Sequence, residues 1–202
     1  MTDSLDPRVA AVADGLTRDE PIERVDRETA AVAVIFRKGA SGEELLLIRR
    51  AEREGDPWSG HVAFPGGRVE AEDSSFRATA VREAREEVGT DLAACAKFLG
   101  YMEAFQTSRR KIRVVPAVFV LTSPASITAN SEVSSHKWVP LELLLSEGIR
   151  STYALAAGAE EVRVPSFNIG GFLVWGLTEK ILSALVESVK GGGGRITRRR
   201  TS

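Results

Sequence analysis

Apolar residues are spaced along the chain in a way that predicts a mixture of strands and helices. Residues 29–36 are apolar on both faces, which predicts a central strand, and residues 44–49 form its hairpin partner. Apolar residues three and four apart predict a short helix over 7–16 and an amphipathic helix that ends near Val189. The other expected elements are strands 96–105, 112–121 and 137–140, a short helix over 141–145, and a hairpin of 150–156 with 161–167. The chain is therefore expected to fold as an α+β domain.

Two residues refine these expectations. Because Pro116 cannot donate a backbone hydrogen bond, we expect 112–121 to be an edge strand or a bulged strand. Trp175, just before the last helix, is expected to fill the core rather than to stack on a ligand.

A further helix, after the turn Phe64-Pro65-Gly66-Gly67, has an acidic face. Its apolar stripe consists of Ala80, Val81, Ala84 and Val88. Asp73 or Ser74 is expected to cap its start, and Gly89 occupies the position of a left-handed C-cap. Its acidic residues stand at i, i+3 and i+4, so that three carboxylates project from one face: Glu83, Glu86 and Glu87.

Two interpretations of this acidic face are open. Most glutamate-rich faces are solvated surface, and here Arg82 and Arg85 would neutralise part of the charge. The alternative is a site for a hard divalent cation, because Mg²⁺ takes oxygen ligands and keeps substrate phosphates in its shell. The diglycine turn in front favours the cation site, since it lets the backbone approach without side-chain obstruction.

The residues from Gly67 to Gly89 resemble the Nudix box, in which a glycine and a glutamate precede Arg-Glu-aliphatic-X-Glu-Glu-X-Gly. Arg82 to Gly89 match the second half of that pattern, whereas Asp73 replaces the first glutamate and the following loop is one residue longer. A similar lengthened loop occurs in the branch that resembles coenzyme A pyrophosphatases. The resemblance implies a Nudix-type α/β/α sandwich with a mixed central sheet and the acidic helix packed on it.

The resemblance also implies an activity, the metal-dependent hydrolysis of a pyrophosphate linkage in a nucleoside diphosphate derivative. The implied ligands of Mg²⁺ or Mn²⁺ are the carboxylates of Glu83, Glu86 and Glu87 and the carbonyl of Gly67. Arg82 would orient these carboxylates, and Glu86 or Glu132 would take the proton of the attacking water.

The substrate implied by the resemblance is coenzyme A or acyl-coenzyme A, which would give 3′,5′-ADP and phosphopantetheine. ADP-ribose, dinucleoside polyphosphates and nucleoside triphosphates are alternative substrates. A Nudix-like binding module without turnover is an alternative of another class, but its usual mark, a lost box glutamate, is absent here.

The segment before the diglycine turn is basic and resembles the leader of coenzyme A-type members. It contains Leu46-Leu47-Ile48-Arg49-Arg50-Ala51, followed by Arg53 and Gly60. This loop is either a solvated turn or a lip that contacts a phosphate-bearing substrate. The candidate substrate-binding residues are Arg49, Arg50, Arg53, Phe64 and Gly66.

Composition restricts the class of protein. The chain has 202 residues and a net charge of −1, which gives no bulk electrostatic basis for nucleic-acid binding. Its apolar runs are too short to span a bilayer, and its single cysteine, Cys95, fits a reducing cytoplasm. We expect an N-terminal helix and linker over 1–28, one Nudix domain over 29–189 and a flexible basic tail over 190–202. Whether the chain forms a homodimer is left open.

Overall fold

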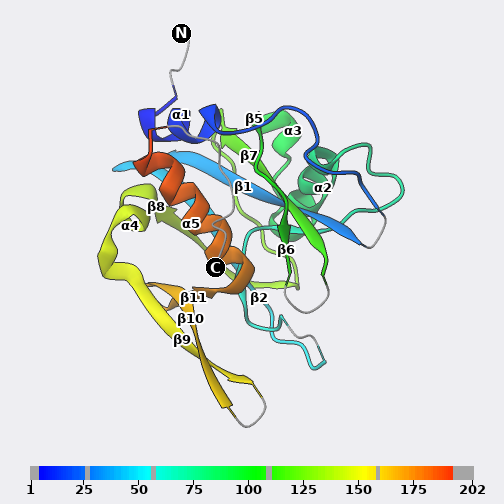
Figure 1. Cartoon of the computed structure of the whole chain (residues 1–202). Coiled ribbons are helices and arrows are strands. Elements are labelled where there is room, and N and C mark those ends of the chain that lie inside the picture. The colour runs from blue at the N-terminus through cyan, green and yellow to red at the C-terminus, as the bar shows by residue number, and fades with distance from the viewer. Residues whose placement is uncertain (1–4, 26–27, 56–57, 108–110, 158–159, 193–202) are drawn as a thin grey trace.

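The computed structural model describes residues 5–25, 28–55, 58–107, 111–157 and 160–192, and Figure 1 shows their arrangement. The helices are α1 (Pro7–Asp14), α2 (Phe76–Val88), α3 (Leu92–Cys95), α4 (Leu141–Leu145), the 3-10 turn η1 (Glu147–Ile149) and α5 (Gly176–Lys190). The larger sheet contains β1 (Thr29–Gly39), β2 (Gly42–Arg50), β3 (Val62–Ala63), β4 (Gly66–Arg68), β5 (Ala96–Tyr101), β6 (Phe105–Gln106), β7 (Arg113–Leu121) and β8 (Val133–Pro140). The smaller sheet contains β9 (Arg150–Ala157), β10 (Glu160–Ile169) and β11 (Phe172–Trp175).

The larger sheet is mixed and has β1 near its centre. Its strand order is β3-β2-β1-β7-β5, with β8 paired to β2, β4 to the first part of β1, and β6 to the first part of β7. Strands β1 and β7 run parallel, whereas β1 and β2 form the predicted hairpin. The central position predicted for residues 29–36 is confirmed.

Helices cover both faces of this sheet because β1 sends alternate side chains to opposite sides. Ala31, Ala33 and Ile35 pack in one apolar cluster with residues of α2 and α3, while Val34 and Phe36 pack in another with residues of α1 and α5. Figure 1 shows α2 and α5 on opposite sides of the sheet. The predicted α/β/α sandwich, with the acidic helix packed on the sheet, is confirmed.

The expectation that 112–121 is an edge strand or a bulged strand is wrong. Strand β7 lies between β1 and β5. The pairing of β5 with β7 is irregular, but the irregularity falls in β5, between Phe98 and Gly100. Pro116 is tolerated inside the sheet because its neighbour is interrupted there: β5 ends at Tyr101 and β6 starts at Phe105. The carbonyl of Pro116 accepts a bond from the Met102 amide in this gap, so the missing N–H faces no regular ladder partner.

Two local predictions also need correction. The residue that caps α2 is Ser75, whose side chain accepts a bond from the Ala78 amide at 2.9 Å, rather than Asp73 or Ser74. Trp175 does not fill the core but is half-buried, with its ring 4.6 Å from that of His61 and 5.2 Å from that of Tyr153. The predicted left-handed C-cap at Gly89 is confirmed by its φ of 67°.

The N-terminal residues pack against the domain. Val9 and Val12 of α1 are fully buried in the cluster that contains α5, and Thr17 forms an isolated bridge with Tyr101 at the β5 edge. The domain limits at 28 and 189 stay a prediction, and residues 193–202 of the predicted tail lie outside the described residues. None of the helices in the described ranges has the length and apolar character needed to cross a membrane.

Candidate active site

Helix α2 withdraws two of its three acidic side chains from water. The Glu87 side chain is 3% exposed and that of Glu83 is 14% exposed, whereas that of Glu86 is 55% exposed. A solvated charged surface would leave all three in water, so this interpretation does not account for the face. Buried carboxylates are costly unless they are paired or coordinate a cation.

The diglycine turn lies directly against this face. The Gly66 amide, at the start of β4, donates to the Glu87 carboxylate at 2.9 Å. A Cβ atom on Gly67 would overlap the carboxylate of Glu83. The missing side chain therefore brings the backbone and two carboxylates of α2 together.

Arg82 joins the loop before α2 to the acidic face of that helix. Its guanidinium donates to the Asp73 carboxylate at 3.0 and 3.2 Å, to Glu83 at 2.9 Å and to Glu86 at 3.3 Å. Paired donors on a planar guanidinium fix the geometry of a carboxylate more strongly than a single ion pair does. Arg82 is thus placed to orient Glu83 and Glu86.

Asp73, which stands where the Nudix box pattern has its first glutamate, is the partner of Arg82. Its side chain is 6% exposed and also accepts bonds from the Glu70 amide and the Thr79 hydroxyl, each at 2.9 Å. Although burial alone would raise the pKa of Asp73, the bonds from Arg82, Glu70 and Thr79 hold it below its usual value. The lengthened loop therefore still delivers a carboxylate to the guanidinium.

Replacing Asp73 by Asn should weaken both the fold and the site. We expect a loss of about 1–3 kcal/mol in the free energy of unfolding, because Arg82 loses its charged partner in a buried position. Turnover should fall by about 10- to 100-fold, as is typical when the partner of a ligand-orienting group is removed. Urea unfolding and kcat measurements test this, with Asp14→Asn at the exposed end of α1 as control; equal values for the two variants would contradict the role of Asp73.

Burial raises the pKa of two box glutamates. The pKa of Glu87 rises to about 7, since burial outweighs the opposing effects of the Gly66 amide and of Arg50. Burial also raises the pKa of Glu83, against the opposing effect of Arg82. The positive charge of Arg50 and Arg82 is therefore too small to offset the desolvation of these carboxylates. A bound cation would add positive charge and favour their ionised form.

The donor types at this site suit Mg²⁺ or Mn²⁺, because carboxylates and a backbone carbonyl are ligands that hard cations prefer. In the described residues, however, no three His, Cys, Asp or Glu side chains are grouped so that they could hold a metal ion. The reason is local: Glu83 and Glu86 are bonded to Arg82, and Glu87 is bonded to Gly66. The missing side chain of Gly67 leaves room for the Glu83 carboxylate against the backbone, and this close approach of a carboxylate to the turn is the feature that fits a cation-binding site.

The two adjacent arginines of the leader lie on opposite faces of β2. Arg50 is on the side of α2, with its guanidinium 3.6 Å from the Glu87 carboxylate. Arg49 is on the other side, where it donates to the Gly171 carbonyl and lies over the Phe172 ring. The structure therefore brings Arg50 to the acidic site and uses Arg49 to join β2 to the smaller sheet. The alternation of side chains along a strand is the signal that separates them in the sequence.

The remaining candidate site residues lie partly at the surface and partly in the apolar core. The side chains of Arg53 and Glu132 are 48% and 42% exposed and form an ion pair at 3.0 Å. Phe64 is 3% exposed and packs in the apolar cluster that contains α5, so the substrate-binding role predicted for its ring does not fit its position. Gly66 contributes its amide to Glu87, as described above.

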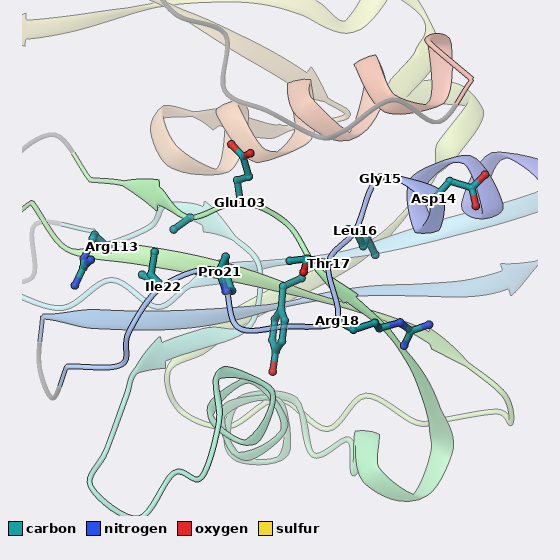
Figure 2. Close-up of a pocket in the computed structure, with 11 residues that line it drawn as sticks. Asp14, Gly15, Leu16, Thr17, Arg18, Pro21, Ile22, Glu103 and Arg113 are labelled. Carbon is teal, nitrogen blue, oxygen red and sulfur yellow. The ribbon is translucent and has the colours of Figure 1, made fainter.

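A pocket of about 810 Å³ lies between the N-terminal segment and the larger sheet, and Glu83, Glu86 and Glu87 do not line it. Figure 2 shows it lined by Thr17, Pro21 and Ile22 on one side, with Arg113 of β7 and Glu103 nearby. None of the candidate site residues lines it. The chemistry of the acidic face, rather than this cavity, therefore identifies the candidate active site.

Comparisons with known proteins identify the family of the chain. The family model described as the NUDIX domain matches residues 26–156. The "Uncharacterized Nudix hydrolase NudL" of Photorhabdus laumondii is 30% identical over 171 residues, which cover 84% of this chain and 90% of that protein. The "Peroxisomal coenzyme A diphosphatase ndx-8" of Caenorhabditis elegans is 31% identical over 154 residues, covering 73% of this chain and 65% of that protein.

The similarity extends to the fold. A crystal structure of a MutT/nudix family protein from Enterococcus faecalis superposes with a TM-score of 0.52 at 19% identity, covering 84% of this chain and 63% of that one. The chain spans between 34% and 65% of the length of the first four curated relatives that it matches. From the family model and the similarity to the Photorhabdus relative over most of both chains, we conclude that the chain belongs to the Nudix family.

Proposed function

We propose that the protein hydrolyses the pyrophosphate linkage of coenzyme A or acyl-coenzyme A, giving 3′,5′-ADP and phosphopantetheine or its acyl derivative. The observation that carries the reaction type is the pair of nearly buried glutamates, Glu83 and Glu87, held against a diglycine turn. Such a pair is costly in a non-catalytic protein and useful where a divalent cation is bound.

The residues of the acidic site divide into cation ligands and a residue that orients them. The carboxylates of Glu83, Glu86 and Glu87 and the carbonyl of Gly67 would hold Mg²⁺ or Mn²⁺. A bound divalent cation neutralises phosphate oxygens and lowers the pKa of an attacking water. Arg82 keeps Glu83 and Glu86 oriented through the bonds that it already makes.

A glutamate must take the proton of the attacking water, and we assign this role to Glu86, with Glu132 as the alternative. Glu86 is 55% exposed with a 3.3 Å bond to Arg82, and Glu132 is 42% exposed with a shorter, 3.0 Å ion pair to Arg53. We expect Glu86→Gln to lower kcat by about 100-fold or more, as loss of a general base does, and Glu132→Gln to lower it by less than about 10-fold. Steady-state kinetics of both variants over pH 6–10 test this; the reverse order would transfer the role to Glu132.

Basic side chains beside the carboxylates support a phosphate-bearing substrate. Arg50 lies next to Glu87 and Arg53 next to Glu132, so both can contact phosphates near the reacting bond. The resemblance of the leader around these arginines to coenzyme A-type members supports coenzyme A, as does the similarity to the Caenorhabditis elegans protein named as a coenzyme A diphosphatase.

A substrate panel tests the proposal. The full chain would be assayed with Mg²⁺ and with Mn²⁺ on coenzyme A, acetyl-coenzyme A, ADP-ribose, a dinucleoside polyphosphate and a nucleoside triphosphate, with products separated by chromatography. We expect the highest kcat/KM for a coenzyme A substrate, release of 3′,5′-ADP, and loss of activity with EDTA. Preference for another substrate would replace coenzyme A, and binding of all of them without turnover would favour a binding module. A cytoplasmic location and a homodimer stay predictions.

A further inference from the structure

The first amides of α2 are bonded by groups from three different parts of the chain. The Phe76 amide donates to the Glu20 carboxylate at 2.7 Å, the Arg77 amide to the Tyr101 hydroxyl at 3.2 Å and the Ala78 amide to the Ser75 side chain at 2.9 Å. These are amides that a helix leaves without internal partners. A carboxylate there is also favoured by the helix dipole. Glu20 thus supplies both a bond and a charge to the start of the acidic helix.

Glu20 belongs to a segment, residues 17–24, that we call the N-terminal strap. At one end, Thr17 exchanges two backbone bonds with Tyr101, at 2.8 and 3.0 Å. At the other end, Arg24 forms an ion pair with Glu20 at 3.1 Å and donates to the backbone carbonyl of Asp73. Figure 2 shows the strap crossing the edge of the larger sheet at Thr17, Pro21 and Ile22. The strap therefore joins the sheet edge to the loop and first turn that lead into α2.

The contacts of the strap continue to the acidic face through two routes. Asp73, whose carbonyl Arg24 holds, binds Arg82 with its side chain, and Arg82 binds Glu83 and Glu86. In addition, α2 is a single helix of 13 residues, so the position of its first turn sets where its later glutamates meet the diglycine turn. The strap precedes residue 26, where the match to the family model begins, so the family model does not cover these contacts.

We propose that the strap is a positioning element for the metal-binding face of α2, with Glu20 and Arg24 as its positioning residues. This inference rests on the proposed function, since it assigns a role toward the cation site. The strap fixes α2 against β4 in the arrangement that places Glu83 and Glu87 beside Gly66 and Gly67. It acts on cation binding and on turnover, and leaves the distant contacts with the substrate unchanged.

The test uses the full chain with substitutions at three positions of the strap. Glu20→Ala removes the acceptor for the Phe76 amide, Glu20→Gln keeps an acceptor without the charge, and Glu23→Ala is the matched control at an exposed neighbouring carboxylate. Mn²⁺ binding to the protein alone is measured by electron paramagnetic resonance, and kcat and KM are measured on the best substrate of the panel. Circular dichroism establishes that each variant is folded.

We expect Glu20→Ala to weaken Mn²⁺ binding and lower kcat by about 3- to 10-fold, less than the 10- to 100-fold typical of groups that contact metal ligands directly. The KM for substrate should change by less than twofold, Glu20→Gln should recover most of both losses, and Glu23→Ala should match the wild type. Folded Glu20→Ala with wild-type Mn²⁺ affinity and kcat overturns the inference, as does loss confined to KM. If Glu20→Ala fails to fold, Arg24→Ala decides: it should weaken Mn²⁺ binding and lower kcat, and a folded Arg24→Ala protein with wild-type Mn²⁺ affinity and kcat overturns the inference. Absence of Mn²⁺ binding by the wild type would instead refute the proposed function.

Discussion

Replacing Glu87 by Gln is expected to lower turnover strongly and, at the same time, to stabilise the metal-free protein. Burial raises the pKa of Glu87 to about 7, above the ordinary 4.5, so the folded protein holds this proton more tightly than the unfolded chain does. The stability linked to Glu87 is therefore present below pH 4.5 and is lost as pH rises to about 7. Gln keeps an acceptor for the Gly66 amide but cannot ionise, so it avoids this loss.

Both the gain in stability and the loss of activity of Glu87→Gln should be large enough to measure. With EDTA at pH 8, Glu87→Gln should exceed the wild type by on the order of 1–3 kcal/mol in the free energy of unfolding. Its kcat with Mn²⁺ should fall by about 100-fold or more, because a cation ligand is lost. Glu72→Gln, at an exposed position in the loop before α2, is the control and should change neither value. A Glu87→Gln protein that is less stable at pH 8, or that keeps its activity, would contradict the account of this carboxylate.

The two glycines of the turn should respond differently to the same substitution. A Cβ on Gly66 would overlap the backbone of Ala31 and Val32, which cannot move without disturbing β1. The three atoms nearest a Cβ on Gly67 would instead all belong to the Glu83 carboxylate, the far end of a flexible side chain. We therefore expect Gly66→Ala to cost about 3 kcal/mol or more in stability, and Gly67→Ala to cost about 1 kcal/mol or less.

The small stability cost of Gly67→Ala should come with a large loss of activity. Gly67→Ala should remain folded but lose about 100-fold or more in kcat, because Glu83 can no longer occupy its place beside the backbone. Thermal unfolding and kinetics of both proteins measure this, with Gly148→Ala as a control at a glycine whose added Cβ meets no atom. Full activity in a folded Gly67→Ala protein would show that the space in front of Gly67 has no role in the reaction.

The sequence predicted the elements of the sandwich well because its apolar periods are strong. Residues 29–36 are apolar on both faces, and this pattern has few solutions other than a covered central strand. The stripe from Ala80 to Val88 predicted the acidic helix itself. That this helix packs on the sheet was implied by the resemblance to the Nudix family, and the structure confirms it.

The errors arose where a contact between distant segments decides the outcome. Pro116 sits inside the sheet because β5 and β6 leave a gap beside it, and no local signal announces that gap. Glu20 was not recognised as a cap for α2, since its partner Phe76 lies 56 residues away. The substrate-binding roles of Phe64 and Arg49 stay predictions, although Phe64 is buried in the core and Arg49 lies on the face of β2 opposite Arg50.

The central claim is that the face of α2 behind the diglycine turn binds divalent cations for cleavage of a diphosphate. Crystals of the full chain grown with Mn²⁺ and a non-hydrolysable diphosphate analogue, with data collected at the manganese absorption edge, test it most directly. The account predicts anomalous peaks among the carboxylates of Glu83, Glu86 and Glu87 and the carbonyl of Gly67, with the diphosphate beside them. Ordered analogue and manganese bound elsewhere, with these carboxylates still paired to Arg82 and Gly66, would contradict it.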